Sequence, residues 1–222
     1  YNQFMDLSKL NKEQKIAVEH KKGPLLVLSG AGTGKTRVLT SRFVYIVKNL
    51  NVNFNKIIAV TFTNKAANEI KERVNTELRS NIDTPWVGTF HSIFAKFLRK
   101  HSGLVNLKSN FTILDIDDQK KLLKQVLEYC KIDKDISEAI YHNEIQNLKD
   151  NKILFNENKK ISKFSSIERL DDIYSYYQQR LIEINAVDFG DILLHSYQIL
   201  FKNPEIKKSY QNYIAVSYTH LR

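Results

Sequence analysis

Residues 29–36 read Ser29-Gly30-Ala31-Gly32-Thr33-Gly34-Lys35-Thr36. A short apolar run, Leu25–Leu28, precedes this stretch, and an apolar residue recurs every three or four positions after Lys35. Glycines let a loop wrap closely around a triphosphate with its N–H groups pointing inward, and a helix that starts directly after the loop adds the positive end of its dipole. The order of strand, glycine-rich loop and helix therefore predicts a phosphate-binding loop, called the P-loop below (residues 29–36).

Two side chains of the P-loop carry the expected chemistry. Lys35 is expected to reach the β- and γ-phosphates of a nucleotide, and the hydroxyl of Thr36 to ligate Mg²⁺. Such loops usually begin with glycine, where this chain has Ser29. A dinucleotide-binding loop is excluded because it needs glycine at the position of Lys35. A turn that binds nothing is the alternative, but three of only seven glycines lie here beside Lys and Thr.

Two further units of strand and helix follow the P-loop. The apolar runs Ile57–Val60 and Trp86–Phe90 are expected to be strands, and helical patterns follow each of them. A helical entry is expected within residues 5–22, and Tyr213–Val216 is expected to be a returning strand. Short strands that alternate with helices predict a parallel sheet with helices on both faces, an α/β fold.

Residues 108–187 show helical patterns only. We expect a first helix capped by Asp117 or Asp118, and further helices near residues 136–149 and 166–184. Another helix is expected at residues 192–201. Residues 108–187 are interpreted as an insertion between two strands of the sheet.

Polar and aromatic side chains follow the ends of two predicted strands. They are Thr61-Phe62-Thr63-Asn64-Lys65 and Gly88-Thr89-Phe90-His91-Ser92. Ligands of open parallel sheets bind at the carboxyl ends of the strands, and aromatic rings there can stack on the bases of a single strand. The alternative is that Phe62 and Phe90 are core residues and that the polar residues cap helices.

The net charge of +10 lies in the first half of the chain. Basic residues outnumber acidic ones in residues 1–107, whereas the two kinds balance in residues 108–222. A basic half indicates a polyanionic partner, nucleotide or nucleic acid, although abundant Lys, Asn and Ile also fit a biased genome. The apolar runs are too short for a membrane span, and one cysteine is typical of a reducing cytoplasm.

Together these segments resemble the N-terminal part of superfamily 1 DNA helicases of the UvrD/PcrA/Rep type. The matching stretches occur in the family's order. They are Leu10–Val18, similar to the adenine-reading Q motif; Ser29–Arg37, similar to Walker A; Val60–Ala67, similar to motif Ia; Gly88–Ser92, similar to motif Ib; and two further landmarks, Phe111–Asp115 and Val187–Leu193.

The resemblance implies a RecA-like P-loop NTPase whose parallel sheet is formed by residues 5–107 and 188–216 (domain 1A). Residues 108–187 would form an inserted all-helical subdomain (1B). It further implies a cytoplasmic, ATP-dependent 3′–5′ DNA helicase with ATP and Mg²⁺ as cofactors. The expected partners are single-stranded DNA and junctions of single-stranded with duplex DNA.

The resemblance also assigns roles to individual residues. The ATP-binding residues would be Gln14 at the adenine, Arg37 near the nucleotide, and Ser29, Gly30, Ala31, Gly32, Thr33, Gly34, Lys35 and Thr36 in the P-loop. Lys35 and Thr36 would serve catalysis, with Thr36 as the Mg²⁺ ligand. The DNA-binding residues would be Phe62, Thr63, Asn64, Thr89, Phe90 and His91.

The resemblance breaks after Tyr213–Val216, where the family places the Asp-Glu pair that holds Mg²⁺ and activates water. This chain continues with Ser217-Tyr218-Thr219-His220-Leu221-Arg222. We therefore expect residues 217–222 to be a non-native end, and ATP turnover by this chain to be slow. Met5 is interpreted as the natural start, so residues 1–4 are also expected to be non-native. Two alternatives stay open: a helicase–nuclease subunit of the AddA/RecB type, and a non-catalytic nucleic-acid-binding P-loop module.

Overall fold

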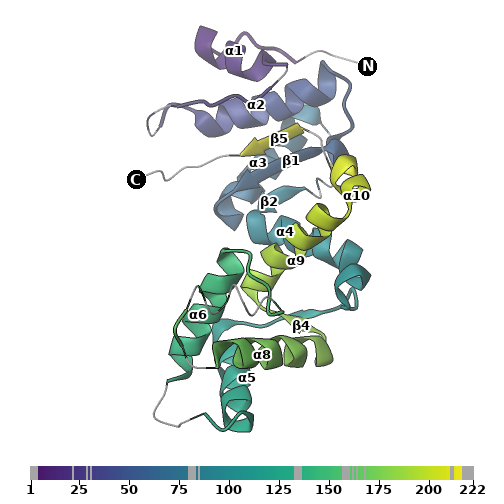
Figure 1. The fold of residues 1–222 in the computed structure, drawn as a ribbon. Helices are drawn as coiled ribbons and strands as arrows, with labels where there is room; N and C mark the ends of the chain where they lie inside the picture. Colours follow the sequence, from purple (N-terminus) through teal and green to yellow (C-terminus); the bar gives the residue numbers. More distant parts are fainter. Residues whose placement is uncertain are drawn as a thin grey trace. The chain divides into compact units, whose positions relative to one another are not determined.

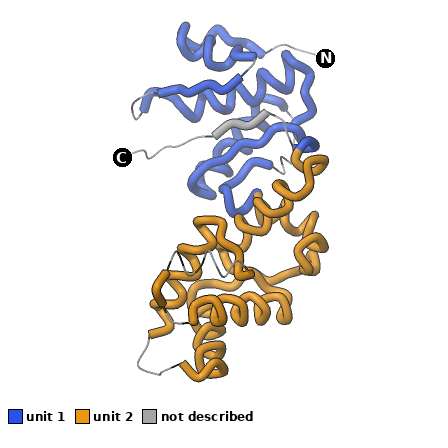
Figure 2. Tube along the Cα trace, viewed as in Figure 1, with its two compact units in different colours: residues 1–93, 208–222 blue, residues 94–207 orange. Residues whose placement is uncertain are grey.

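The computed structural model divides the chain into two compact units. Unit 1 comprises residues 1–93 and 208–222, and unit 2 comprises residues 94–207 (Figure 2). The residues described are 5–21, 23–28, 30, 32–79, 84, 86–132, 137–156, 161, 163, 165–167, 169–210 and, for the backbone, 213–216. The assignment of domains 1A and 1B stays a prediction.

Unit 1 is built on a parallel three-stranded sheet (Figure 1). Its strands, in the order β2-β1-β5, are β1 (Ile57–Thr61), β2 (Val87–Thr89) and β5 (Tyr213–Val216). Its helices are α1 (Lys12–Glu19), α2 (Lys35–Lys48), α3 (Asn64–Leu78), the short 3-10 helix η1 (Phe54–Lys56) and the first turn of α4 (Phe90–His101). The strands predicted at residues 57–60 and 213–216 are thus confirmed. The strand predicted at residues 86–90 is confirmed for residues 87–89, whereas Phe90 already begins α4.

The local sequence explains where α2 and α3 begin. Gly34 adopts a left-handed conformation (φ 89°) immediately before α2, which few other residues tolerate. The hydroxyl of Thr63 accepts a hydrogen bond from the N–H of Ala66 and so caps α3. The apolar stripes of both helices pack with the sheet in one core, formed by Leu39, Phe43, Ile46, Ile57, Ala59, Ile70, Val74 and Val87.

The strand expected at Leu25–Leu28 is wrong. Its backbone joins no ladder with the described residues, and its side chains are exposed, by 78% for Leu26 and 77% for Leu28. A parallel strand needs a neighbour that supplies N–H and C=O groups. β1 has β2 and β5 on its two sides, and neither of these outer strands pairs with residues 25–28 along its free edge.

Unit 2 is mainly helical. Its elements are the rest of α4, the 3-10 helix η2 (Ser102–Val105), β3 (Thr112–Ile113), α5 (Ile116–Tyr129), α6 (Glu138–Asp150), α8 (Leu170–Glu183), β4 (Ala186–Val187), α9 (Phe189–Lys202) and most of α10 (Pro204–Ser209). Its core is formed by side chains of α5, α6 and α8, with Leu123, Tyr141, Leu148, Tyr174 and Tyr177 among the most buried.

Two sequence expectations for this unit are corrected. The stretch 108–187 is not exclusively helical, because β3 and β4 form a short parallel pair. The cap of α5 is Asp115, whose carboxylate accepts the N–H of Asp118 at 2.9 Å, so neither Asp117 nor Asp118 is the cap. An N-cap must itself lie outside the helix, whereas both later aspartates lie in the first turn.

A buried charge cluster joins three helices of unit 2. The ammonium of Lys149 (α6) lies 2.6 Å from a carboxylate oxygen of Asp188 and 2.8 Å from one of Asp191, and all three side chains are inaccessible to solvent. Asp188 and Asp191 also cap the start of α9 reciprocally, each accepting the backbone N–H of the other. The remaining donors are Gln146, Tyr177 and Gln178.

Ionisation in this cluster depends on the ion pair. Burial alone would raise the pKa of Asp188, but the charge and hydrogen bonds of Lys149 hold it below its usual value. Burial opposes the charge of Lys149, yet the two carboxylates raise its pKa overall.

Gly190 leaves the space that the cluster needs, because a Cβ there would lie 2.7 Å from Oε1 of Gln146. The cluster thus depends on its opposite charges and on a glycine at position 190.

Candidate functional site

The described part of the P-loop closes on its own backbone. The ammonium of Lys35 donates to the carbonyl oxygen of Gly30 at 2.7 Å, and the hydroxyl of Thr33 donates to the same oxygen at 2.8 Å. Gly32 and Gly34 have positive φ angles of 77° and 89°. These conformations curl the loop around the start of α2, where unpaired N–H groups favour an anion. Ser29 and Ala31 lie outside the described residues.

The structure brings Gln14 to the P-loop. Its side-chain amide donates to the carbonyl oxygen of Thr33 at 3.3 Å, and a Cβ on Gly34 would lie 3.4 Å from the same nitrogen. Gln14 is also the third residue of α1, where it forms a capping box with Asn11. Two segments that are separated by the apolar run at residues 25–28 are therefore in contact.

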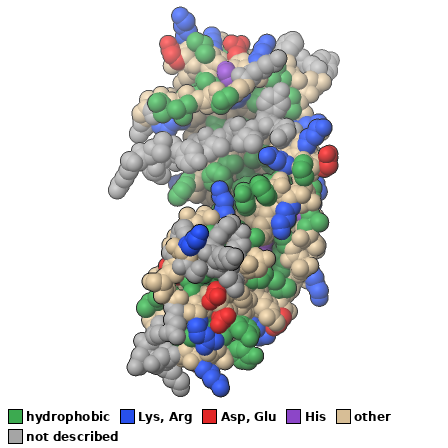
Figure 3. All heavy atoms as spheres, in the orientation of Figure 1, with side chains coloured by type: hydrophobic (Ala, Val, Ile, Leu, Met, Phe, Trp, Pro, Cys, Tyr) green, Lys and Arg blue, Asp and Glu red, His purple; other side chains and the backbone are tan. Residues whose placement is uncertain are grey.

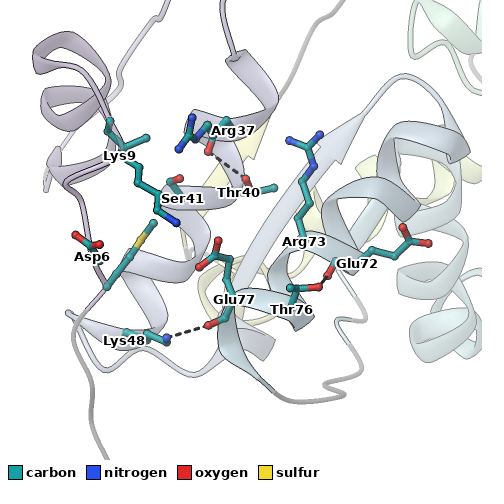
Figure 4. Close-up of a pocket in the computed structure, with 12 residues that line it drawn as sticks. Asp6, Lys9, Arg37, Thr40, Ser41, Lys48, Glu72, Arg73, Thr76 and Glu77 are labelled. Atoms are coloured by element: carbon teal, nitrogen blue, oxygen red, sulfur yellow. Dashed lines mark hydrogen bonds between the residues drawn. The ribbon is translucent and has the colours of Figure 1, made fainter.

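Arg37 lies in a groove beside α2 rather than in the curl of the P-loop. The groove has a volume of about 460 Å³ and is lined by the segment before α1, by α2 and by the second half of α3 (Figure 4). The guanidinium groups of Arg37 and Arg73 both lie in the upper part of Figure 4. Arg73 also forms an ion pair with Glu69. The groove carries both signs of charge, since Lys9, Lys48, Glu72 and Glu77 are all among its lining residues.

The two polar strand ends lie at one edge of the sheet. Thr61, the last residue of β1, pairs in register with Thr89, the last residue of β2. Phe62 and Phe90 each stand one residue beyond these positions. Phe62 is 72% exposed, which contradicts the core alternative for this residue, whereas Phe90 is half-buried. Thr63, Asn64 and His91 are exposed, and Thr89 is half-buried.

A close contact shapes the second of these strand ends. The hydroxyl of Ser92 donates to the carbonyl oxygen of Thr89 at 2.9 Å, and the N–H of Ser92 donates to the hydroxyl of Thr89 at 3.3 Å. A Cβ on Gly88 would lie 2.4 Å from the Ser92 hydroxyl oxygen, so a larger residue at position 88 would displace this hydroxyl from its place in the turn. The turn includes both Phe90 and His91.

The metal expectation can be tested against the donors present. Among the described residues, no group of three or more His, Cys, Asp or Glu side chains could hold a metal ion. Mg²⁺ commonly binds nucleotide phosphates with few protein ligands and several waters. Thr36, the second residue of α2, would offer such a site a single hydroxyl ligand.

Comparison with known proteins identifies the family. The profile of the UvrD/REP helicase N-terminal domain matches residues 10–217. The chain belongs to this family. The resemblance inferred from the sequence motifs is thereby confirmed.

Individual relatives agree with the family assignment. This chain is 38% identical over 208 residues to ATP-dependent DNA helicase PcrA of Staphylococcus aureus (strain Mu50 / ATCC 700699). The aligned region is 93% of this chain and 28% of PcrA. The chain is 44% identical over 211 residues to DNA helicase II of Rickettsia typhi, and this aligned region is 91% of this chain and 31% of the relative. A probable DNA helicase II homolog of Rickettsia felis is 43% identical over 206 residues. The chain thus spans about three tenths of these relatives' length.

Other expectations are answered in part. Within the described part of the chain, no helix is long and apolar enough to cross a membrane. The predicted ends at residues 1–4 and 217–222, including the position expected for the Walker B pair, lie outside the described residues. The motifs did not indicate two polar residues that the structure places in key contacts, Arg42 and Lys149. Each bonds to partners far away in the sequence, so a local pattern carries no signal for it.

Proposed function

We propose that this chain is the ATP-binding and single-strand-binding part of an ATP-dependent 3′–5′ DNA helicase of the UvrD/PcrA type. In this proposal unit 1 contains the RecA-like sheet, and the helices of residues 108–187 form subdomain 1B. ATP hydrolysis, unwinding at single-strand/duplex junctions and 3′–5′ polarity are proposed for the longer protein. The names of the relatives, ATP-dependent DNA helicase PcrA and DNA helicase II, support helicase activity in those proteins.

The observation that carries the nucleotide part is the convergence of Gln14 and the P-loop. Lys35 and the N–H groups at the start of α2 supply positive charge for the phosphates. Thr36 would supply a ligand to Mg²⁺, which would neutralise phosphate charge during transfer. Gln14 lies beside Gly34, where its amide could read the edge of a base. Arg37, whose side chain lines the groove beside α2, would have to turn toward the P-loop to contact the nucleotide.

The register of β1 and β2 supports the DNA part. It places Phe62, Thr63 and Asn64 beside Thr89, Phe90 and His91 at the carboxyl edge of the sheet. An exposed ring offers a stacking surface to a base, while hydroxyl, amide and N–H groups suit phosphates. Such contacts tolerate any sequence, so binding should weaken steeply as salt increases.

Two binding assays test this proposal. We expect the chain to bind a fluorescent ATP analogue with Mg²⁺ and a labelled single-stranded oligonucleotide. Lys35→Ala should abolish nucleotide binding and leave DNA binding intact, whereas Phe62→Ala should weaken DNA binding by at least fivefold, the effect of losing one stacked base. Lys121→Ala, on the exposed face of α5, is the matched control and should change neither.

The outcomes separate the candidate functions. A chain that binds DNA but no nucleotide would favour a non-catalytic nucleic-acid-binding module. A chain that binds neither ligand would contradict the proposal. The full-length protein then decides the polarity, since a 3′–5′ helicase unwinds duplexes with a 3′ single-stranded tail in preference to those with a 5′ tail.

A further inference from the structure

Arg42 holds the end of α1. It lies on α2, and its Nη1 donates to the carbonyl oxygens of Ala17, Val18 and His20 at 3.2, 3.1 and 2.7 Å. The last carbonyls of a helix lack partners within the helix, and they form the negative end of its dipole. A guanidinium is always charged and is therefore well suited to hold several of them together.

The same end of α1 is packed against α2. Ala17 and Val18 are buried with Leu10, and their partners on α2 are Val38 and Tyr45. Apolar contact alone permits a short helix to slide or rotate, because dispersion forces have little directionality. The hydrogen bonds from Arg42 do have direction, and they fix the position of α1 along α2.

This fixed end lies one helical turn from Gln14. The side chain of Gln14 can donate two hydrogen bonds and accept two. One donor is used by Thr33 and one acceptor by the N–H of Asn11. Among the described residues, no partner is seen for its second donor and second acceptor, which are the pair that an amide needs to bind the edge of adenine. Their direction depends on where α1 lies, because Gln14 is part of that helix.

We propose that Arg42 is a positioning residue for base recognition, holding α1 so that Gln14 faces the base of a nucleotide bound at the P-loop. This inference rests on the proposed function, since it concerns the same site. Arg42 touches neither the phosphates nor the base in this scheme. Its loss should therefore affect recognition of the base and leave recognition of the phosphates unchanged.

The test compares two ligands that differ in the nucleoside. Affinities for Mg-ATP and for inorganic tripolyphosphate are measured by displacement of a fluorescent ATP analogue. Arg42→Met, which retains the aliphatic shape, should weaken ATP binding about tenfold, the effect of one charge-assisted hydrogen bond. Its affinity for tripolyphosphate should change less than twofold. Arg180→Met removes a half-exposed arginine from a surface pair with Glu183 and should change neither affinity.

A second comparison asks whether Arg42 acts through Gln14. Gln14→Ala should lower ATP affinity without affecting tripolyphosphate, and Arg42→Met in the Gln14→Ala background should cause less than a twofold further loss. Losses that multiply, or an equal loss for both ligands, would overturn the inference. If Arg42→Met does not fold, Arg42→Lys is used, and the ratio of the two affinities decides in the same way.

The failure of the proposed function gives a different result. Wild-type chain that binds neither ATP nor tripolyphosphate would overturn the proposed function, and this inference with it. Wild-type chain that prefers ATP, together with an Arg42 variant that keeps the same preference, would overturn only the role of Arg42.

Discussion

Lys149 offers a sharp test of how unit 2 is held together. Its ammonium is inaccessible to solvent and lies 2.6 and 2.8 Å from the carboxylates of Asp188 and Asp191. Lys149→Met keeps much of the side chain's length and apolar volume but removes the charge. The variant would leave two carboxylates buried without a cation, at the start of α9.

The expected cost follows from that arrangement. Removing one partner of a buried ion pair typically destabilises a protein by about 3–5 kcal/mol, because the remaining charge stays desolvated. Lys149 serves two carboxylates, so we expect a loss near the upper end, about 4–5 kcal/mol. Folded domains are stable by only about 5–15 kcal/mol. With a urea dependence of about 2 kcal/mol per molar, the midpoint of unit 2 should fall by about 2 M.

Urea titration with two probes measures this loss. Far-UV circular dichroism follows the helices, whereas fluorescence of the single tryptophan, Trp86, reports on unit 1. Lys121→Met, whose pair with Asp118 is exposed, is the matched control and should cost less than about 0.5 kcal/mol. Adding Asp188→Asn and Asp191→Asn to Lys149→Met should recover part of the stability, because no buried charge then remains.

Two results would refute this reasoning. The first is a Lys149→Met variant with a midpoint within 0.5 M of the wild type, a margin of about 1 kcal/mol. The second is a triple variant that is less stable than Lys149→Met. Either would show that the buried charges are not the reason for the cost.

Three further predictions follow from the hydrogen bonds of the structure. Lys149 holds the pKa of Asp188 below its usual value, so the stability that this carboxylate contributes to the wild type is present above pH 3.8 and is lost as the pH falls through the lower folded-state value. In Lys149→Met burial raises the pKa of this carboxyl instead, so protonation removes the buried charge, and urea titrations at falling pH should show the stability difference between variant and wild type becoming smaller. Asp115→Ala should cost about 1 kcal/mol in thermal or urea unfolding, whereas Asp117→Ala should cost less than half of that, because only Asp115 caps α5. Gly88→Ala and Ser92→Ala should each weaken single-strand binding about fivefold in fluorescence anisotropy, because both remove the hydrogen bond from the Ser92 hydroxyl to the Thr89 carbonyl oxygen. The double variant should therefore bind no more weakly than either single variant, and additive losses would contradict this shared cause.

The sequence predicted most of the elements whose signals are local. The glycines of the P-loop, the stripe Leu39–Phe43–Ile46 and the apolar strand Ile57–Val60 each express their structure within a few residues. The start of α9 shows the limit of such signals. We expected this helix from residue 192, but the reciprocal caps of Asp188 and Asp191 begin it at Phe189, despite a glycine in its first turn.

Within the candidate site, the sequence predicted which residues take part better than it predicted what their side chains contact. The P-loop and Gln14 were both expected at the nucleotide, and the structure brings them into contact. Arg37 was expected there too, yet it lies exposed along a groove that also contains Arg73. The position of a long side chain depends on what packs beside it, and spacing along the chain does not encode that.

What the sequence alone determined, then, is the P-loop, the tendency of each segment to form a helix or strand, and the family. The tertiary structure decided which tendencies were realised and which polar groups met. Leu25–Leu28 has the composition of a buried strand but forms none, because a strand depends on a hydrogen-bonding neighbour. Arg42 reaches a carbonyl 25 residues away and Lys149 a carboxylate 39 residues away. Such contacts exist only once the chain has folded, because no property of the local sequence brings their partners together.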